Sequence, residues 1–389
     1  MGIGGSISRE WRRIANRPMM IVASVGVPLF CALFIGSIFG NGRMEELPIA
    51  VIDNDFSSTS RSIIRTLDAS PSLQTSNDTI TLPEAFDALK RREIYGIVII
   101  PQGFSDDIVS GRSTSLPYYY HYAYLSIGTT VQSTLQTLLT TISLSPLVEV
   151  GKASGIAPTR IEEFLLPIEA ATHPLFNPTL NFNIYLVVPF YFIMLQIVVM
   201  MVTVYSLGND IESGGGRDWI SQSGNNMAKA TLGKIAPYTF LFWVSTIISV
   251  FLLTSLSHTP SPQFALQIIL YALLLIVASQ GIGVTIYACI GRMDISLSIS
   301  SMIGSLGATL SGVTFPLREF YAPFELSAYL LPIRHFTTLT EDLPYGGSTI
   351  VILCIHIAIL HLFSLLPLIF LRRLRHLATS ERYAPRTTS

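Results

Sequence analysis

Six apolar runs, each long enough to cross a bilayer, occupy two separate parts of this sequence. The hydrocarbon core of a bilayer is about 30 Å thick, so a helical crossing needs roughly 20 mostly apolar residues. The first run, Met19–Gly40, contains no charged residue. The runs span residues 19–40, 184–207, 236–257, 264–290, 295–313 and 350–371. Charged residues make up only 13% of the chain, against ~25% in soluble proteins, so we expect a polytopic α-helical membrane protein with six transmembrane helices.

Arginines flank both ends of this membrane region. Those before the first run are Arg9, Arg12, Arg13 and Arg17, and those after the last are Arg372, Arg373, Arg375, Arg382 and Arg386. Basic residues favour the cytoplasmic side, and six crossings return the chain to the side where it began. We therefore expect both termini to be cytoplasmic, together with residues 1–18, 208–235 and 372–389. Residues 41–183 then form an extracytoplasmic insert.

The insert alternates between strand and helix patterns. Strand patterns cover residues 48–52, 95–101 and 116–124, and helix patterns cover 57–67, 83–92, 103–110 and 129–154. This order predicts an α/β domain with a small mixed sheet covered by helices. The stretch 177–183 is the expected last extended segment before the second crossing. The insert contains no cysteine, which excludes a disulfide framework within it.

Two further segments have patterns of their own. Residues 6–17 place Ile7, Trp11 and Ile14 at helical spacing with arginines opposite, which predicts an interfacial amphipathic helix. An ordinary basic anchor before the first crossing is the alternative. Residues 314–349 are moderately apolar but contain several prolines, so we expect a re-entrant or extracytoplasmic segment with two short helices within Leu317–Glu341.

Several kinds of chemistry are absent from the sequence. It has no G-x-x-x-x-G-K-[ST], H-E-x-x-H, C-x-x-C or G-x-S-x-G, so we expect no ATP site, metal, cofactor or catalytic residue in this chain. The apolar runs also lack the ionisable groups that ion-coupled transporters place in the membrane. Buried polar residues such as Gln196, Gln280 and His356 are expected to be helix-packing partners rather than ligands. Active transport by such a chain would need energy from a partner.

Five stretches, in order along the chain, resemble the permease subunit of ABC-2 type exporters, in the branch with a large external domain between the first two crossings. SREWRRIANRPMMIVASVGVPLFCALF resembles that family's interfacial helix and first crossing, with a helix break at Arg17-Pro18. LPIAVIDNDFSSTSRSIIRTLDAS and YGIVIIPQGFSDDIVSG resemble parts of its external domain. NPTLNFNIYLVVP and LLPIRHFTTLTEDLPYGGS resemble the entry to its second crossing and the segment before its last.

The resemblance implies a subunit that is not itself an enzyme. Two permease chains, identical or different, would form the translocation path, and separate ABC ATPase subunits would bind and hydrolyse ATP. The setting would be a bacterial cytoplasmic (inner) membrane, with an envelope adaptor and outer-membrane channel as further partners and no nucleic acid. The residues that would transmit ATPase motion are Arg9, Trp11, Arg12, Arg13, Asp210, Glu212 and Arg217. The last three lie where the family usually has E-R-E-x-G-T, replaced here by NDIESGGGRDW.

Two other classes of function remain open at this point. A membrane-anchored sensor or ligand-binding protein would explain the insert but not the five later runs. An intramembrane enzyme would need a nucleophile and base, or metal ligands, within the membrane, and the sequence offers no such cluster. The substrate, and the choice between a homodimer and a heterodimer, are not encoded in any pattern that we recognise.

Overall fold

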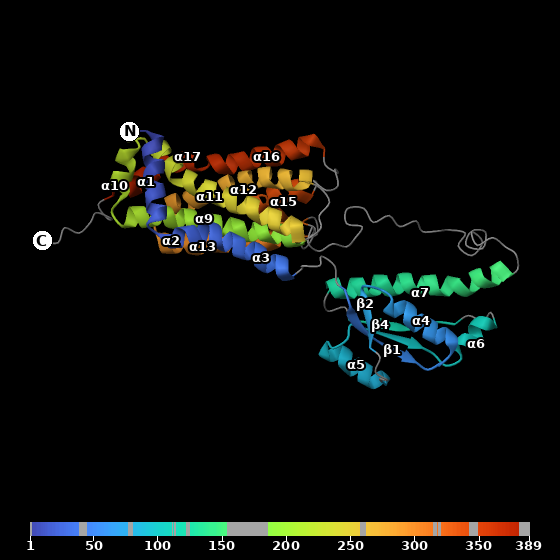
Figure 1. Cartoon of the computed structure of the whole chain (residues 1–389). Coiled ribbons are helices and arrows are strands. Elements are labelled where there is room, and N and C mark those ends of the chain that lie inside the picture. The colour runs from blue at the N-terminus through green and yellow to red at the C-terminus, as the bar shows by residue number, and fades with distance from the viewer. Residues whose placement is uncertain are drawn as a thin grey trace. The chain divides into compact units, whose positions relative to one another are not determined.

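The computed structural model divides the chain into two compact units (Figure 1). It describes residues 2–38, 45–76, 81–110, 112, 114–121, 125–153, 186–256, 262–313, 317, 320–341 and 349–380. One unit combines residues 1–42 with 174–389, and the other comprises residues 43–173. The extended segment expected at 177–183 lies outside the described residues.

Five helices of the first unit are long and apolar enough to cross a membrane. They are Pro18–Ile38, Val188–Glu212, Met227–Ser255, Gln263–Ile290 and Ile350–Thr379. The first consists of α2 (Pro18–Ile21), the π-helical turn η1 (Val22–Gly26) and α3 (Val27–Ile38). The next three lie within α9 (Val188–Glu212), α11 (Met227–Leu256) and α12 (Pro262–Ile290), and the last joins α16 (Ile350–Leu365) to α17 (Pro367–Thr379). The chain is therefore a multi-pass membrane protein.

The sixth apolar run forms α13 (Met293–Leu310), which is not among these five helices. Its 18 residues give a length of about 27 Å, slightly short of a bilayer core. Its small residues face α9: a methyl group added at Gly304 would lie 2.5 Å from Cγ1 of Ile197. Bulky Met302 and Leu306 are exposed. The count of six crossings therefore stays a prediction.

The N-terminal helix α1 (Ile3–Ala15) ends just before the expected break. Arg17 leaves helical geometry with φ −130° and ψ 85°, and Pro18 begins α2, as the Arg17-Pro18 break predicted. The buried residues of α1 are Ser6, Glu10 and Ile14, and this face packs against α11. Most of the face that α1 buries is thus polar, and Trp11 remains exposed.

Prolines lie at the starts of the two short helices between α13 and α16. Two short helices, α14 (Ala322–Ala328) and α15 (Pro332–Glu341), form within Leu317–Glu341, as the sequence predicted. Pro323 lies in the first turn of α14 and Pro332 begins α15, positions where the missing proline N–H costs nothing. Phe336 of α15 packs on Phe192 of α9, with ring centroids 4.4 Å apart.

The second unit contains a four-stranded sheet with the order β2-β1-β3-β4. The strands are β1 (Leu47–Asp53), β2 (Leu73–Ser76), β3 (Gly96–Ile100) and β4 (Tyr118–Tyr120). The first three are parallel, and β4 pairs with β3 in the antiparallel sense. The sequence did not reveal β2, because LQTS is a short polar edge strand without an apolar run.

Helices cover both faces of this sheet. They are α4 (Ser58–Asp68), α5 (Leu82–Arg91), α6 (Phe104–Val109) and α7 (Leu125–Ala153). Ile49 and Val98 pack with α4, α6 and α7, whereas Ala50 and Ile97 pack with α5. Helix starts are capped: Ser57 accepts a hydrogen bond from the Ser60 N–H at 3.0 Å, and Thr81 forms a capping box with Glu84.

Candidate coupling site

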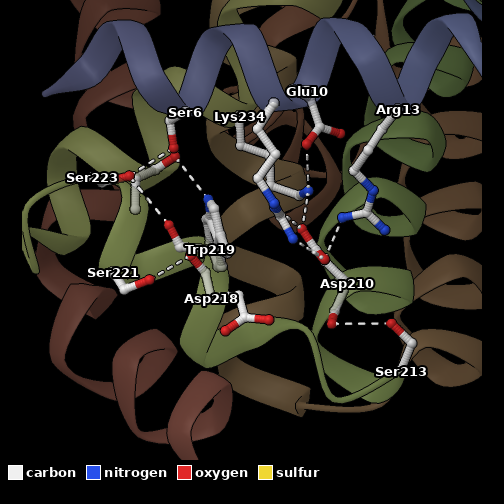
Figure 2. Close-up of polar contacts among 12 residues, drawn as sticks. Ser6, Glu10, Arg13, Asp210, Ser213, Asp218, Trp219, Ser221, Ser223 and Lys234 are labelled. Atoms are coloured by element: carbon white, nitrogen blue, oxygen red, sulfur yellow. Dashed lines mark hydrogen bonds and ion pairs between the residues drawn. The ribbon is translucent and has the colours of Figure 1, made fainter. Parts of the chain in front are cut away.

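Helix α1 packs closely against α11 within the first unit. A methyl group added at Gly233 of α11 would lie 2.5 Å from Cβ of Ser6, so only glycine permits this packing. The Ser6 hydroxyl is 2.6 Å from the hydroxyl of Ser223, which follows α10 (Gly216–Gln222). The approach brings the polar face of α1 against the ends of α9 and α11 nearest to it (Figure 2).

Asp210, near the end of α9, is the centre of the site. Arg9 donates two hydrogen bonds to its carboxylate, 2.7 Å to Oδ2 and 2.9 Å to Oδ1. Arg13 forms an ion pair with the same carboxylate, and Lys234 Nζ lies 2.7 Å from Oδ2. Two of these three cations come from α1 and one from α11, so a single carboxylate joins three helices.

Glu10 completes the cluster from the side of α1. Its Oε2 accepts from Lys234 Nζ at 2.9 Å, and its Oε1 accepts from the Tyr238 hydroxyl at 3.0 Å. Figure 2 shows Glu10 and Arg13 pointing from α1 toward Asp210 and Lys234. Glu10, Asp210 and Lys234 are each at most 2% exposed, so these charges depend on one another rather than on water.

The electrostatics of the cluster favour its intact form. Burial alone would lower the pKa of Arg9, but its hydrogen bonds and ion pair with Asp210 outweigh that effect and raise the pKa. Arg9, Arg13 and Lys234 supply three positive charges, and Glu10 and Asp210 supply two negative ones, so the cluster carries a net charge of +1. Removal of one partner would leave a buried charge uncompensated, which typically costs about 3–5 kcal/mol.

Three consecutive glycines follow α9, and each position favours glycine for a different structural reason. Gly214 has φ +82°, a left-handed conformation that favours glycine. A methyl group at Gly215 would lie 2.8 Å from Oδ1 of Asp210, and one at Gly216 would lie 2.3 Å from the carbonyl oxygen of Ala378. The three glycines therefore let the chain turn closely under the Asp210 carboxylate and against α17.

The seven residues predicted for coupling do not all meet. Arg9, Arg13 and Asp210 come together in the cluster. Glu212 instead accepts from the Met293 N–H at 2.7 Å and so caps the start of α13, while Arg217 donates to the Thr379 carbonyl at 3.2 Å at the end of α17. The other two lie on the outer side of α1, where Trp11 meets Phe240 edge-on and Arg12 is exposed.

Sequence reasoning missed Glu10, Lys234 and Tyr238. Glu10 is the single acidic residue within the basic stretch SREWRR. That isolated acid is a signal that could have indicated an ion pair within the protein. Lys234 and Tyr238 are four residues apart on α11 and therefore share one face, but their partner at Glu10 is more than 220 residues away in sequence. The sequence placed Lys234 only within the expected cytoplasmic segment 208–235, whereas the structure places it inside α11.

Chemically, the site joins three helices through paired charges. Among the residues that the structure describes, no group of three or more His, Cys, Asp or Glu could hold a metal ion. The charges of the cluster are held in one arrangement by short hydrogen bonds between α1, α9 and α11. Such buried networks link the motions of the helices that contribute to them.

The comparison with known protein families agrees with this architecture. The family described as ABC-2 family transporter protein matches residues 18–372, which is most of the chain. No curated individual protein matches it. Members of this family are membrane components of transporters that associate with an ABC ATPase, and by its sequence and its helices this chain belongs to the ABC-2 family of transporter proteins.

Proposed function

We propose that this chain is the permease subunit of an ATP-driven exporter and forms the translocation path with a second permease chain. ATP would be bound and hydrolysed by separate ATPase subunits, and this chain would carry no cofactor and catalyse no reaction. The family supports the transporter role, and the absence of a P-loop from the sequence supports the separate ATPase.

The observation that carries the proposal is the buried charge cluster beneath α1. An ATPase bound on the cytoplasmic side would push on α1, and Asp210 would pass the movement to α9 while Lys234 passed it to α11. Buried ion pairs suit this task because breaking any one of them is costly, so the helices move together. The cluster connects only elements that lie at the expected cytoplasmic ends of the crossings.

The membrane arrangement in this proposal has α13 as the sixth crossing. Its packing along α9, with Gly304 against Ile197, supports a place at the edge of the bundle, where exposed Met302 and Leu306 would face lipid. Six crossings put both termini and the cluster in the cytoplasm and residues 43–173 outside, where they would meet an envelope adaptor or outer-membrane channel. The membrane would be the bacterial inner membrane.

Affinity purification tests this function directly. The tagged full-length chain is extracted from its native membrane in mild detergent, and its companions are identified by mass spectrometry. Recovery of an ABC ATPase, alone or with a second permease, supports the exporter and distinguishes a homodimer from a heterodimer. Recovery of the chain alone in several detergents, without ATPase activity, would contradict the proposal and favour the sensor.

A second experiment tests the role of the cluster. Arg9→Gln and Arg13→Gln are introduced into the purified complex in lipid nanodiscs, and ATP hydrolysis and transport are measured together. We expect the ATPase to stay bound and to hydrolyse ATP while transport falls at least ten-fold. Equal loss of both activities, or no loss of transport, would show that the cluster is not a coupling element.

A further inference from the structure

A notch between α1, α9 and α11 lies beside the charge cluster. Its lining consists of Glu10, Arg13, Arg17, Met20, Tyr205, Ser206, Asn209 and Tyr238. The notch encloses only about 10 Å³, room for about one water molecule, so a larger group can occupy only its open mouth.

Three polar side chains in the notch have no side-chain bonding partner among the residues that the structure describes. Arg17, Tyr205 and Asn209 form no side-chain hydrogen bond or ion pair with any residue that the structure describes. Together they offer a guanidinium, a hydroxyl and a carboxamide, all of which can donate hydrogen bonds. A group with several acceptor oxygens would satisfy them at once, and phosphate is such a group.

The charged residues that line and adjoin the notch also favour the binding of an anion. The neighbouring cluster already has one more positive than negative charge, and Arg13 belongs both to it and to the notch lining. Arg17 adds a further positive charge at the same place. The two arginines that line the notch outnumber its one carboxylate, that of Glu10, so an incoming anion would meet a net positive lining.

The apolar residues around the notch identify the source of that anion. Met19, Ile21 and Val22 follow Arg17 directly and are 69%, 42% and 51% exposed, as residues that contact acyl chains would be. Trp11 and Phe240 form an exposed aromatic pair nearby, of the kind found at membrane interfaces. The notch thus lies at the boundary between a basic helix and a lipid-facing surface, which is the level of lipid phosphates.

We propose that this notch binds the phosphate of an anionic phospholipid headgroup through Arg17, Asn209 and Tyr205. The bound lipid holds α1 against the membrane unit and leaves Arg13 shared between the phosphate and Asp210. Basic pockets between helices on the cytoplasmic side are a known way for proteins to select such headgroups.

The test uses the full-length protein and measures lipid retention. The protein is equilibrated in detergent with equal amounts of phosphatidylglycerol and phosphatidylcholine, and co-bound lipid is counted by native mass spectrometry. The variants are Arg17→Gln and, as a matched control on the same basic helix, Arg12→Gln, which does not line the notch. Melting in phosphatidylcholine alone checks that both variants fold like the parent.

We expect the parent and Arg12→Gln to retain phosphatidylglycerol in preference to phosphatidylcholine, and Arg17→Gln to bind it about five-fold more weakly, as the loss of one arginine near a headgroup predicts. Equal losses in the two variants would overturn the site, because they would indicate a general attraction to basic charge. If inorganic phosphate displaced phosphatidylglycerol at equal concentration, the lipid would be excluded as the specific ligand.

Discussion

Lys234 of α11 lies between two carboxylates, with its Nζ 2.7 Å from Oδ2 of Asp210 and 2.9 Å from Oε2 of Glu10. The side chain of Lys234 is fully buried, and its Nζ also lies 5.5 Å from the ring centroid of Trp219. A single ammonium group therefore joins α1 to α9 and α11.

Substitution of Lys234 by methionine should destabilise the membrane unit by about 3–5 kcal/mol. Asp210 would keep its two arginines, but Glu10 would lose the one cation that forms an ion pair with it among the residues that the structure describes, and would remain buried beside Tyr238. The apparent melting temperature and the yield of folded protein in detergent would measure the effect. Lys229→Met is the control, because Lys229 is exposed on the same helix and should change stability by less than about 0.5 kcal/mol.

The contact between α1 and α11 can be tested without changing any charge. Gly233→Ala places a methyl group where Cβ of Ser6 is 2.5 Å away and the Ile3 carbonyl oxygen is 3.2 Å away. Overpacking of this kind costs about 1–3 kcal/mol, so α1 should separate from α11 more often. Faster amide hydrogen exchange in residues 3–15 would report it.

Gly4→Ala provides the control for that experiment. A methyl group at Gly4 would meet nothing within 4 Å, so this change should leave the contact intact and favour the helix by up to ~1 kcal/mol. Equal exchange in Gly233→Ala and the parent would show that α1 does not depend on this close approach.

The sequence predicted the local features of the fold well, because they arise from local physics. Apolar runs gave the five long helices, Arg17-Pro18 gave the break before α2, and the prolines gave α14 and α15. The strand β2 was missed because its place in the sheet comes from pairing with β1 rather than from its own residues. The number of crossings depends on α13, whose serines and glycines make it the least apolar run.

The candidate site was predictable only in part, because it depends on pairing between distant segments. Arg9, Arg13 and Asp210 were predicted from the family resemblance, and the structure brings them together. Glu10 and Lys234 are ordinary charges when taken alone, and their contact appears only once α1 lies on α11. Glu212 and Arg217 were expected in the same site, but each stabilises the end of another helix instead.

Two buried glutamines should respond in opposite ways to an apolar substitution. Gln280 accepts from the Thr239 hydroxyl at 2.6 Å and donates to the Ile235 carbonyl at 3.4 Å. Gln280→Met removes both hydrogen bonds and should cost about 0.5–1.5 kcal/mol, since Thr239 keeps the Ile235 carbonyl, 3.1 Å away, as an acceptor. The carboxamide of Gln196 is buried against α13 and has no hydrogen-bond partner within the described part of the chain. Gln196→Met should therefore leave stability unchanged or raise it.

Melting temperatures of the two variants in the same detergent check this prediction. A large loss of stability for Gln196→Met would mean that its carboxamide has a partner in the folded protein, such as a water molecule or the second permease chain. Comparison at several protein concentrations would then separate these two partners, since only the second depends on association.

We expect the folded protein to lose stability in acid because of a pair of buried histidines. His335 of α15 and His356 of α16 place their Nδ1 atoms 2.8 Å apart, and Nε2 of His335 donates to the Tyr329 carbonyl at 2.9 Å. That donation requires the proton of neutral His335 to be on Nε2, so His356 must donate to Nδ1 of His335. Protonation of His335 would make both of its ring nitrogens donors, so His356 would have to move its own proton from Nδ1 to Nε2 and give up its present arrangement.

The pKa of His335 points the same way. Burial lowers it, and the positive charge of Arg334 lowers it further, although the hydrogen bond to Tyr329 opposes both effects. Because the folded protein binds this proton less readily than the unfolded chain, the stability from the neutral pair is complete above the ordinary histidine pKa of about 6.5. This stability declines as the pH falls below that value.

We expect the melting temperature to drop between pH 7.5 and pH 5, and His335→Gln to reduce the drop. His361→Gln, a change at an exposed histidine on α16, should leave the drop unaltered, and an equal drop in all three proteins would show that the pair does not sense pH.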